Sequence, residues 1–548
     1  MRVLIIGAVA AGTSAAAKAR RNDESAEIVI YEKDTYISYS GCGMPFYLSG
    51  ELLDKEELYP RDEKYFKKKY NVDVLTSHEV LEIDPEKKAI KVKNLKSGDE
   101  FYDHYDKLVI ATGARMSVPG IPGVCRKNVF TFRNINDLNR LEKFIKEENP
   151  KKACIIGTGY LGLELCDSLT RIGIKVSLVA RKPYVTSALD PDMAVYVEDY
   201  IREKGIEVLK GKTVKEIGDK KIEFSDGTAL DCDFVVLATG VEPCTELAKK
   251  AGIKLGVRGA ILVNEKMETS IPDIYACGDC VALNHLVANI PVYKPLGSTA
   301  NKTGRVAGDN LSGGNSSMPG VLGTGIFRVF DMAVGVTGLT EKEAETLGYD
   351  VASCVDIKVD KPEYLGGKEI VIKAVACRRT GRLLGVQIVG QSGVDKRLDV
   401  FVAALTFKAS VKDLINLDLA YSPPFSTTKD PVMYIGMILD NMINRDKKLV
   451  QPRELAGMME AGEEINIIDT REKAYYNISH IKGAKNIPLK DLRAEADSLD
   501  KNKKTACYCN EGQTACNAQN ILINKGFSDV YNLTGGIKHY KKVNKGEG

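Results

Sequence analysis

A single cysteine stands in the run Tyr39-Ser40-Gly41-Cys42-Gly43-Met44-Pro45, with no second cysteine within a helical turn of it. Where two neighbouring cysteines share a redox site, electrons pass through their internal disulfide. Tyr47 occupies the place where such a mate could sit. A lone thiol must find its partner sulfur on a substrate or become oxidised itself. The motif therefore predicts single-cysteine redox chemistry at Cys42, with Ser38 and Ser40 as candidate substrate-binding residues.

The segment before this cysteine has the pattern of a βαβ nucleotide-binding unit. An apolar strand ends at Gly7, an Ala-rich helix follows, and a second strand ends at Glu32. The turn Gly7-Ala8-Val9-Ala10-Ala11-Gly12 keeps the first and last glycines of GxGxxG but has Val9 at the second. A helix N-terminus attracts anions such as a pyrophosphate, and an acid about 20 residues later accepts ribose hydroxyls. The alternative is that these glycines only make a tight turn.

A second unit of the same kind follows about 150 residues later. Gly157-Thr158-Gly159-Tyr160-Leu161-Gly162 fits GxGxxG fully, between a strand and a helix. The next strand ends in Ala180-Arg181-Lys182, without an acid to hold an unphosphorylated ribose. Arg181 or Lys182 could pair with a 2′-phosphate, which favours NADPH over NADH. The alternative is two solvated surface cations.

Length and composition limit the class of protein. The 548 residues suggest three or four domains, and 77 basic against 74 acidic side chains leave a net charge of +3. This balance argues against nucleic acid as a partner. The sequence has no run of about 18 apolar residues, so no membrane span is predicted. Because the first strand begins at Arg2 and 13 cysteines are scattered along the chain, a cytoplasmic protein with reduced thiols and no metal site is expected.

The elements suggest two similar domains followed by two others. A strand that ends in Ala-Thr-Gly follows each nucleotide unit, at Ala111-Thr112-Gly113 and at Ala238-Thr239-Gly240. The predicted α/β fold has two Rossmann-like domains, an α+β domain with helical patterning from Lys396 to Leu417, and a small C-terminal α/β domain. The predicted boundaries are 1–148 with 275–319 for the first domain, 149–274 for the second, 320–443 for the third, 444–451 for a linker and 452–548 for the last.

The chain resembles the flavoprotein pyridine nucleotide-disulfide reductase family over residues 1 to about 445. The resemblance is carried by both glycine motifs, by Ala111-Thr112-Gly113 and by the run from Thr269 to Asp279. It implies FAD on the first unit, contacted by residues that include Gly278, Asp279 and Ala300. It also implies NAD(P)H on the second unit, where Tyr160 gates the nicotinamide pocket and Glu164 lies beside the stacked rings. The third domain would form the interface of a homodimer.

Within this family, single-cysteine members differ in what meets the cysteine. NADH oxidases and peroxidases carry a histidine in the first glycine turn, where this chain has Ala10 and Ala11. In coenzyme A-disulfide reductases the cysteine bonds to coenzyme A, and two tyrosines reach the partner's active site. Glu363-Tyr364-Leu365 and Ala420-Tyr421-Ser422 resemble those tyrosine motifs, so Tyr364 and Tyr421 are candidate proton donors. Both could instead be ordinary core tyrosines. The candidates for holding coenzyme A phosphates are Lys18, Arg20 and Arg21.

The last hundred residues resemble a rhodanese domain. Ile468-Asp469-Thr470-Arg471 and Cys507-Tyr508-Cys509-Asn510-Glu511-Gly512-Gln513-Thr514 carry the resemblance, together with the run from His480 to Pro488. It implies a persulfide-carrying thiol at Cys509, whereas Cys507 and Cys516 are expected to be packing residues. Thr514 stands where many relatives have an arginine, and the charge of Glu511 predicts poor binding of anionic donors. Alternatively, the domain is an inactive docking module.

Together these motifs favour an FAD-dependent NAD(P)H reductase of coenzyme A disulfide and of coenzyme A persulfide or polysulfide. A sulfur-carrying module has a use beside a persulfide reductase and none beside a plain disulfide reductase. The expected partners are a small thiol or persulfide substrate and a second copy of the chain. Two alternatives stay open: an NADH oxidase or peroxidase on the same scaffold, and a redox-sensing protein whose rhodanese domain docks a partner.

Overall fold

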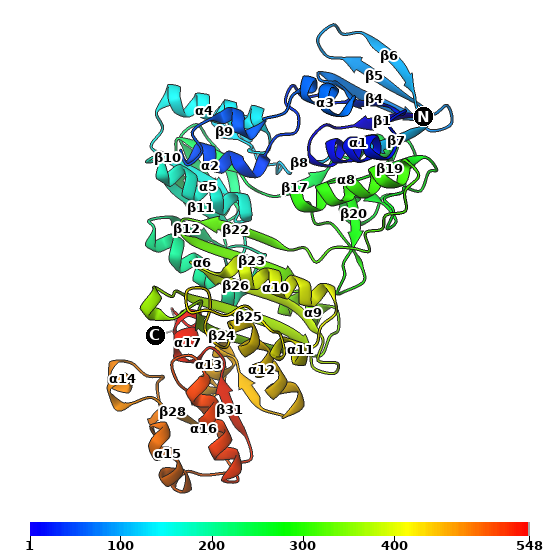
Figure 1. Ribbon diagram of the computed structural model, residues 1–548. Coiled ribbons are helices and arrows are strands. Elements are labelled where there is room, and N and C mark those ends of the chain that lie inside the picture. Colours follow the sequence, from blue (N-terminus) through cyan, green and yellow to red (C-terminus); the bar gives the residue numbers. More distant parts are fainter. Residues whose placement is uncertain (546–548) are drawn as a thin grey trace. The chain divides into compact units, whose positions relative to one another are not determined.

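The computed structural model describes residues 1–545, which divide into two compact units (Figure 1). Unit 1 comprises residues 1–183 and 204–323, and unit 2 comprises residues 184–203 and the chain from residue 324 onward. Within residues 1–545, no helix is both long and apolar enough to cross a bilayer. Each unit is described by itself below.

Unit 1 contains two parallel five-stranded sheets with matching strand order. The first sheet runs β3-β2-β1-β7-β19 and the second runs β12-β11-β10-β16-β9. Their elements are β1 (Arg2–Ile6), α1 (Ala10–Asn22), β2 (Glu27–Tyr31), β3 (Asp73–Leu75), β7 (Lys107–Ile110), β9 (Val129–Phe130), β10 (Lys152–Ile156), α5 (Tyr160–Arg171), β11 (Lys175–Ala180), β12 (Glu207–Lys210), β16 (Phe234–Leu237) and β19 (Ile274–Ala276). The predicted pair of Rossmann-like domains is confirmed, because in each sheet the glycine turn joins the central strand to the following helix.

Small residues let helices α1 and α8 of unit 1 approach closely. A Cβ atom on Gly304 of α8 would lie 2.2 Å from the carbonyl oxygen of Ala11 on α1, so only glycine fits there. The other elements of unit 1 are α2 (Met44–Leu48), α3 (Glu63–Tyr70), β4 (His78–Asp84), β5 (Ala89–Asn94), β6 (Glu100–His104), β8 (Ala114–Met116), α4 (Ile135–Glu148), β13 (Val214–Ile217), β14 (Lys221–Phe224), β15 (Ala229–Asp231), β17 (Val241–Pro243), α7 (Glu246–Lys250), β18 (Ile261–Leu262), β20 (Val281–Asn284), β21 (Pro291–Val292) and α8 (Gly297–Leu311).

The first part of unit 2 is an antiparallel sheet with the order β22-β23-β26-β25-β24, accompanied by helices. Its elements are β22 (Gly325–Val329), β23 (Met332–Gly338), α9 (Glu341–Thr346), β24 (Val351–Val359), β25 (Glu369–Cys377), β26 (Leu383–Gly390), α10 (Val394–Thr406), α11 (Val411–Ile415) and α12 (Pro431–Asn444). The predicted helical stretch from Lys396 to Leu417 is two helices. Lys408, with a φ of 59°, lies in the break, because a left-handed residue cannot continue a helix.

The second part of unit 2 is a parallel sheet with the order β27-β31-β30-β28-β29. Its elements are β27 (Lys448–Val450), α13 (Pro452–Glu460), β28 (Ile465–Asp469), α14 (Lys473–Ile478), β29 (Lys485–Asn486), α15 (Leu489–Glu495), β30 (Lys504–Tyr508), α16 (Gln513–Asn524), β31 (Val530–Leu533) and α17 (Gly536–Val543). The predicted linker 444–451 contains β27, which pairs with β31. This part of the linker is therefore an edge strand of the C-terminal sheet.

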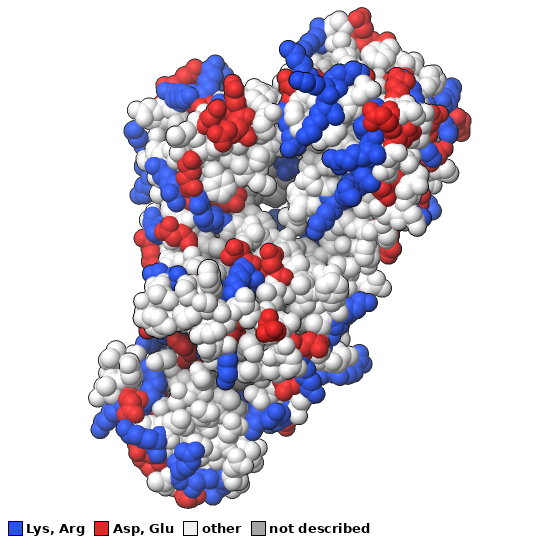
Figure 2. Space-filling model, viewed as in Figure 1, with Lys and Arg blue, Asp and Glu red and all other residues white. Residues whose placement is uncertain are grey.

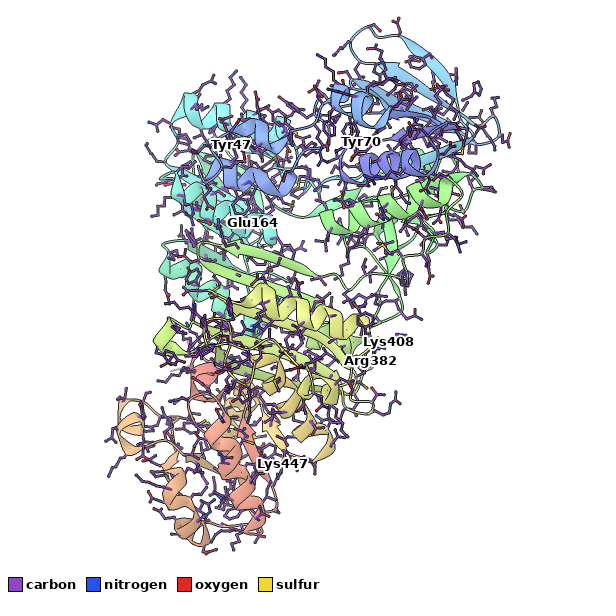
Figure 3. All side chains as sticks on the ribbon, in the orientation of Figure 1. Tyr47, Tyr70, Glu164, Arg382, Lys408 and Lys447 are labelled. Atoms are coloured by element: carbon purple, nitrogen blue, oxygen red, sulfur yellow. The ribbon has the colours of Figure 1, made fainter. Side chains whose placement is uncertain are left out.

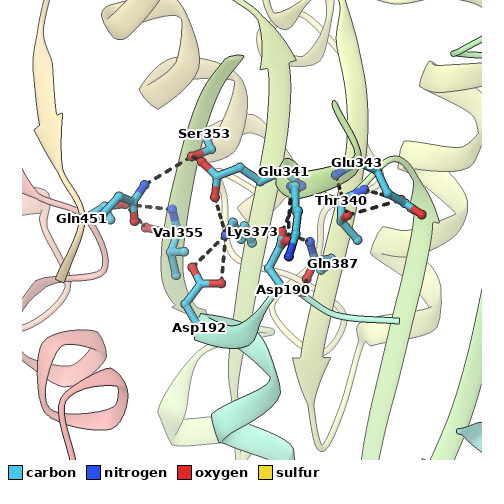
Figure 4. A network of polar contacts seen from close by, with 12 residues as sticks. Asp190, Asp192, Thr340, Glu341, Glu343, Ser353, Val355, Lys373, Gln387 and Gln451 are labelled. Atoms are coloured by element: carbon cyan, nitrogen blue, oxygen red, sulfur yellow. Dashed lines mark hydrogen bonds and ion pairs between the residues drawn. The ribbon is translucent and has the colours of Figure 1, made fainter. Parts of the chain in front are cut away.

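Helix α6 (Pro191–Glu203) lies in the predicted second domain but belongs to unit 2. The reason is a buried lysine on β25, Lys373, whose Nζ lies 2.8 Å from Asp192, 2.7 Å from Glu341 and 3.3 Å from Asp190 (Figure 4). Only 2% of the lysine side chain is exposed. A buried charge needs opposite charges around it, so the lysine holds α6 and α9 against the sheet.

The C-terminal domain is docked on the edge strand β24. The hydroxyl of Thr534 accepts a hydrogen bond from the Val355 amide at 2.8 Å and donates one to the Val355 carbonyl at 3.0 Å. His539 on α17 stacks on Tyr196 of α6 and shares a 3.0 Å hydrogen bond with its hydroxyl. Because both groups of Val355 are satisfied by one side chain, the two parts of unit 2 are held by specific contacts as well as by the chain connection.

Candidate active sites

Two equivalent glycine turns bring helix N-termini to the ends of the parallel strands in unit 1. Gly7 has a φ of 106°, and a Cβ atom on it would lie 2.3 Å from the Ala111 carbonyl oxygen. Gly157 has a φ of 116°, and a Cβ atom on it would lie 2.2 Å from the Ala238 carbonyl oxygen. Both positions therefore require glycine. The N-termini of α1 and α5 fit a dinucleotide pyrophosphate, because helix N-termini attract anions.

Glu32 lies at the end of β2 and is 8% exposed. Its Oε2 accepts a hydrogen bond from the Ala8 amide at 2.8 Å, and its Oε1 accepts one from the Asp34 amide at 2.9 Å. Burial raises the pKa of this carboxyl. Each carboxylate oxygen has a further lone pair, so the group fits both the turn and a ribose hydroxyl.

The other predicted nucleotide contacts lie near the same strand ends and helix starts. Thr112 and Gly113 follow β7, Gly159, Tyr160 and Gly162 form the start of α5 with Glu164 one turn later, Arg181 follows β11, Gly278 and Asp279 follow β19, and Ala300 lies on α8. The Asp279 carboxylate accepts a hydrogen bond from Arg133 at 2.6 Å, and the Asp279 carbonyl accepts one from the Tyr293 hydroxyl at 2.9 Å. The donors and acceptors present therefore fit two dinucleotides.

Cys42 lies in a short 3-10 turn just before α2 and is exposed. The preceding loop is fixed by hydrogen bonds from the Ser38 amide to the Ala8 carbonyl at 2.9 Å and from the Ser40 amide to the Leu58 carbonyl at 2.7 Å. The first of these ties the cysteine loop to the first glycine turn. Tyr47, labelled in Figure 3, lies on α2. Its hydroxyl donates to Glu142 at 2.9 Å, so it has a structural partner.

The charges around Cys42 do not favour its thiolate. Nearby protein atoms exclude part of the water around Cys42, and this partial desolvation raises the pKa of its thiol. The Cys42 side chain is nevertheless exposed. The Glu164 and Asp279 carboxylates raise this pKa further, and the Arg133 guanidinium partly offsets them. These groups of the chain itself therefore do not lower the pKa of Cys42 below its ordinary value. Stabilisation of the thiolate falls to whatever binds beside it.

Glu164→Gln should lower the pKa of Cys42, because it removes a nearby negative charge. The rate of Cys42 alkylation by iodoacetamide at pH 7.5, measured by peptide mass spectrometry on protein freed of nucleotide, should rise roughly threefold. Arg133→Met should slow it by a similar factor. Glu147→Gln, an exposed charge change on α4, is the matched control. Equal rates in all four proteins would contradict the assignment.

The predicted phosphate-binding cations on α1 are not equivalent. Arg20 is 4% exposed, and its guanidinium donates to the carbonyls of Tyr70, Asn71, Asp23 and Glu24. The prediction for Arg20 was wrong, because its side chain points inward from α1 and is occupied by backbone. Lys18 pairs with Asp309 at 2.8 Å, and Arg21 is exposed. Figure 2 shows basic side chains gathered over α1 and α3, where Lys18 and Arg21 stay candidates.

Tyr364 and Tyr421, in unit 2, are exposed. Their exposed fractions are 78% and 51%, and Leu365 and Phe425 beside them are exposed at 40% and 69%. The alternative of two core tyrosines with buried hydroxyls is thereby contradicted. Large apolar side chains exposed together are typical of a surface that meets another protein.

Cys509 begins the loop between β30 and α16. It is 5% exposed, and its Sγ accepts a hydrogen bond from the Gly512 amide at 3.1 Å. A backbone amide that donates to the sulfur can stabilise negative charge on it or on a terminal persulfide. Cys507 is fully buried in the core, as expected of a packing residue, whereas Cys516 is only partly buried and lines a pocket.

Three cations near these thiols were not found from the sequence. Arg133 reaches Asp279 from a loop before α4, Arg471 pairs with Asp469 and approaches Asn510 in the Cys509 loop at 3.4 Å, and Lys358 of β24 approaches Glu511 at 3.9 Å. Arg471 is the last residue of the Ile468-Asp469-Thr470-Arg471 motif, so its position offered a signal. Arg133 and Lys358 lie in no motif, and only the fold brings them to the sites.

Comparisons with known families match nearly the whole chain. The pyridine nucleotide-disulphide oxidoreductase model matches residues 1–302, and the dimerisation domain of the same family matches residues 326–431. The rhodanese-like domain model matches residues 451–543.

Individual proteins of known name agree with these matches. The NADH oxidase of Methanocaldococcus jannaschii is 37% identical over 79% of this chain and 97% of its own length. The NAD(P)H coenzyme A polysulfide/persulfide reductase of Pyrococcus horikoshii is 35% identical over 80% of this chain and 98% of its own. The crystal structure of the reduced CoADR-RHD of Bacillus anthracis, 34% identical, superposes with a TM-score of 0.96 over 99% of this chain and 98% of that one.

Proposed function

Because the chain belongs to the pyridine nucleotide-disulphide oxidoreductase family, we propose that it reduces coenzyme A persulfide and coenzyme A disulfide with NAD(P)H. The observation that carries the proposal is an exposed lone thiol, Cys42, on a chain with two dinucleotide cradles and a second thiol built into a rhodanese loop. The relative from Pyrococcus horikoshii with the name of a persulfide reductase supports the substrate class. A homodimer that brings Tyr364 and Tyr421 to the partner's Cys42 completes the proposal, supported by the dimerisation domain.

The chain's residues would hold both cofactors of the family. The N-terminus of α1 would bind the FAD pyrophosphate, Glu32 its ribose and Asp279 its ribityl region. The N-terminus of α5 would bind the NAD(P)H pyrophosphate, with Tyr160 at the nicotinamide. When bound, FAD supplies the electron pair, which it receives from NAD(P)H. Arg133 keeps the Asp279 carboxylate in place through their 2.6 Å contact.

Cys42 performs the sulfur chemistry. Its thiolate attacks the inner sulfur of coenzyme A persulfide, so a Cys42–coenzyme A disulfide forms and hydrosulfide leaves with the electrons of the broken S–S bond. Two electrons and one proton then break this disulfide, which regenerates the Cys42 thiolate and releases coenzyme A thiol. Tyr364 or Tyr421 of the partner subunit would give that proton, since a phenol hydroxyl can donate to a leaving thiolate.

Anaerobic turnover tests the proposal. NADPH and NADH oxidation is followed with coenzyme A persulfide, coenzyme A disulfide or hydrogen peroxide, and sulfide is measured. Sulfide formed one-for-one with NAD(P)H and coenzyme A persulfide supports the proposal. Fast peroxide turnover without sulfur-substrate activity would reject it in favour of the oxidase or peroxidase function, which the Methanocaldococcus relative's name favours. Absence of any turnover by the FAD-loaded protein would favour the redox-sensing interaction protein.

A preference for NADPH is expected from the end of β11. Arg181 is exposed there, and Lys212 is brought alongside by the hydrogen bond from its amide to the Ala180 carbonyl at 3.1 Å. Arg181→Ala should raise the KM for NADPH about tenfold by removing one charged partner of the 2′-phosphate, and should change the KM for NADH less than twofold. Lys175→Ala, at the other end of the same strand, is the control. Equal changes with both nucleotides would refute a phosphate contact.

A further inference from the structure

The rhodanese loop of this chain has an acid, Glu511, two residues after Cys509 and lacks a closing arginine at Thr514. An uncompensated carboxylate here would repel anionic sulfur donors. The structure places two lysines on it. Nζ of Lys538, from α17, lies 2.7 Å from Glu511, and Nζ of Lys358, from β24, lies 3.9 Å from it. The loop carboxylate is therefore paired with cations from outside the loop.

These contacts belong to a chain of alternating charges, Glu369, Lys538, Glu511, Lys358 and Asp356, which we call the charge chain. Lys538 also contacts Glu369 at the start of β25, and Lys358 lies 3.2 Å from Asp356. The side chains of Glu369 and Lys538 are partly exposed. At the other end of the charge chain, the Asp356 side chain is 5% exposed and that of Lys358 is 14% exposed. In the charge chain, Lys538 and Glu511 come from the C-terminal domain, and the other three residues come from the dimerisation domain. The charge chain therefore runs through the contact between the two domains.

Lys358 is held at the active-loop end of this contact. Its ammonium group lies 5.2 Å from the centre of the Tyr434 ring on α12, and a pocket of about 180 Å³ is lined by Lys358, Asp356, Glu511 and Gly512. Burial raises the pKa of Asp356 to about 6, and one of its carboxylate oxygens has no hydrogen-bond partner among the described atoms. With this pKa Asp356 is mostly ionised at neutral pH, so the ammonium group of Lys358 is shared between Asp356 at 3.2 Å and Glu511 at 3.9 Å.

We propose that Lys358 is a positioning residue of the rhodanese site. From the dimerisation domain, and in place of the missing loop arginine, it joins Lys538 in offsetting the charge of Glu511. Cys509 can then accept an anionic sulfur donor such as thiosulfate or a hydropersulfide anion. The Thr534–Val355 hydrogen bonds keep β24 in place for this role. The proposal predicts the opposite of what the charge of Glu511 alone predicts, because this lysine from outside the loop faces Glu511. The inference rests on the proposed role of Cys509 as a sulfur carrier.

The transfer step itself is simple. The Cys509 thiolate attacks the outer sulfur of thiosulfate, an S–S bond forms to Cys509, and sulfite leaves with the electron pair of the broken bond. Two negatively charged reactants must approach each other. A cation that cancels the Glu511 charge therefore increases the rate with anionic donors and changes the rate with neutral ones little.

The test compares an anionic with a neutral thiol reagent on the full chain. Alkylation of Cys509 by iodoacetate and by iodoacetamide is measured by peptide mass spectrometry. Lys358→Gln should lower the iodoacetate-to-iodoacetamide rate ratio roughly threefold. Lys358→Arg should keep the wild-type ratio, and the double variant Lys358→Gln/Glu511→Gln should restore it, since the net charge is that of the wild type. Lys525→Gln, at the far end of α16 and paired with Asp497, is the control.

An unchanged ratio in Lys358→Gln, or no recovery in the double variant, would overturn the inference. If Lys358→Gln folds poorly because Asp356 loses its cation, the same comparison is made between Asp356→Asn and Asp356→Asn/Lys358→Gln. NADPH oxidation with coenzyme A disulfide should be equal in all variants, which shows that they are folded. If the ratio changes as expected but thiosulfate loads no sulfur onto wild-type Cys509, the sulfur-carrier role fails and the electrostatic assignment stands.

Discussion

Cys42→Ser is expected to abolish turnover with coenzyme A persulfide and coenzyme A disulfide while the protein keeps its FAD. A serine hydroxyl cannot form a disulfide with a sulfur substrate, so the covalent step is lost and the rate should fall at least about a thousandfold. The exposed position of Cys42 in a short turn means that the loss of its sulfur costs little packing. The measurements are anaerobic NADPH oxidation, sulfide release and the flavin absorbance of the purified protein.

Cys125→Ser provides the matched control, because Cys125 is also a free, exposed cysteine of unit 1. It should turn over at the wild-type rate. The flavin of Cys42→Ser should still be bleached by NADPH, since hydride transfer does not need the thiol. Turnover of Cys42→Ser within tenfold of the wild type would mean that another group meets the substrate sulfur, and the proposed mechanism would have to be abandoned.

Lys373→Met is expected to destabilise unit 2 strongly. The substitution leaves Asp190, Asp192 and Glu341 without the buried cation that they share. Removing one partner of a buried ionic cluster typically costs about 3–5 kcal/mol. Although burial alone would raise it, His539 and Lys373 hold the pKa of Asp192 well below its ordinary value. Urea unfolding followed by circular dichroism measures the loss.

The loss should depend on pH. A carboxyl with a lowered pKa contributes stability above its unfolded value of about 3.9, and this contribution disappears as the pH falls through the folded value. The difference between wild type and Lys373→Met should therefore be largest at neutral pH and shrink below about pH 4. Lys412→Met, an exposed lysine on α11, should change stability by less than about 0.5 kcal/mol. A loss below 1 kcal/mol for Lys373→Met would show that the carboxyls find other partners.

The nucleotide-binding units could be predicted because their signals are local. The glycines at positions 7 and 157 are needed by turns that lie within a few residues of them, and the strands beside those turns are continuous apolar runs. The same holds for the predicted C-terminal α/β domain, whose strands β28, β30 and β31 are short runs that bury most of their residues.

Features that depend on distant contacts could not be read from the sequence. The inward position of Arg20 follows from which side of α1 packs against the sheet, and four carbonyls determine its role. The membership of α6 in unit 2 depends on Lys373, about 180 residues further along the chain. The pKa of Cys42 depends on charges from three other segments. For these sites the sequence supplies the residue types and the fold supplies their neighbours.

The hydroxyl of Thr534 gives β24 a property that can be followed in solution. The Val355 amide lies on the outer edge of the sheet and donates its hydrogen bond to Thr534. Its rate of hydrogen–deuterium exchange therefore reports how often the rhodanese domain lifts from the sheet. The same contact occupies part of a strand edge that would otherwise offer free amides and carbonyls to another chain. Removal of the rhodanese domain would thus expose this part of the β24 edge as a template for aggregation. The rhodanese domain therefore protects the edge of the sheet to which it is docked.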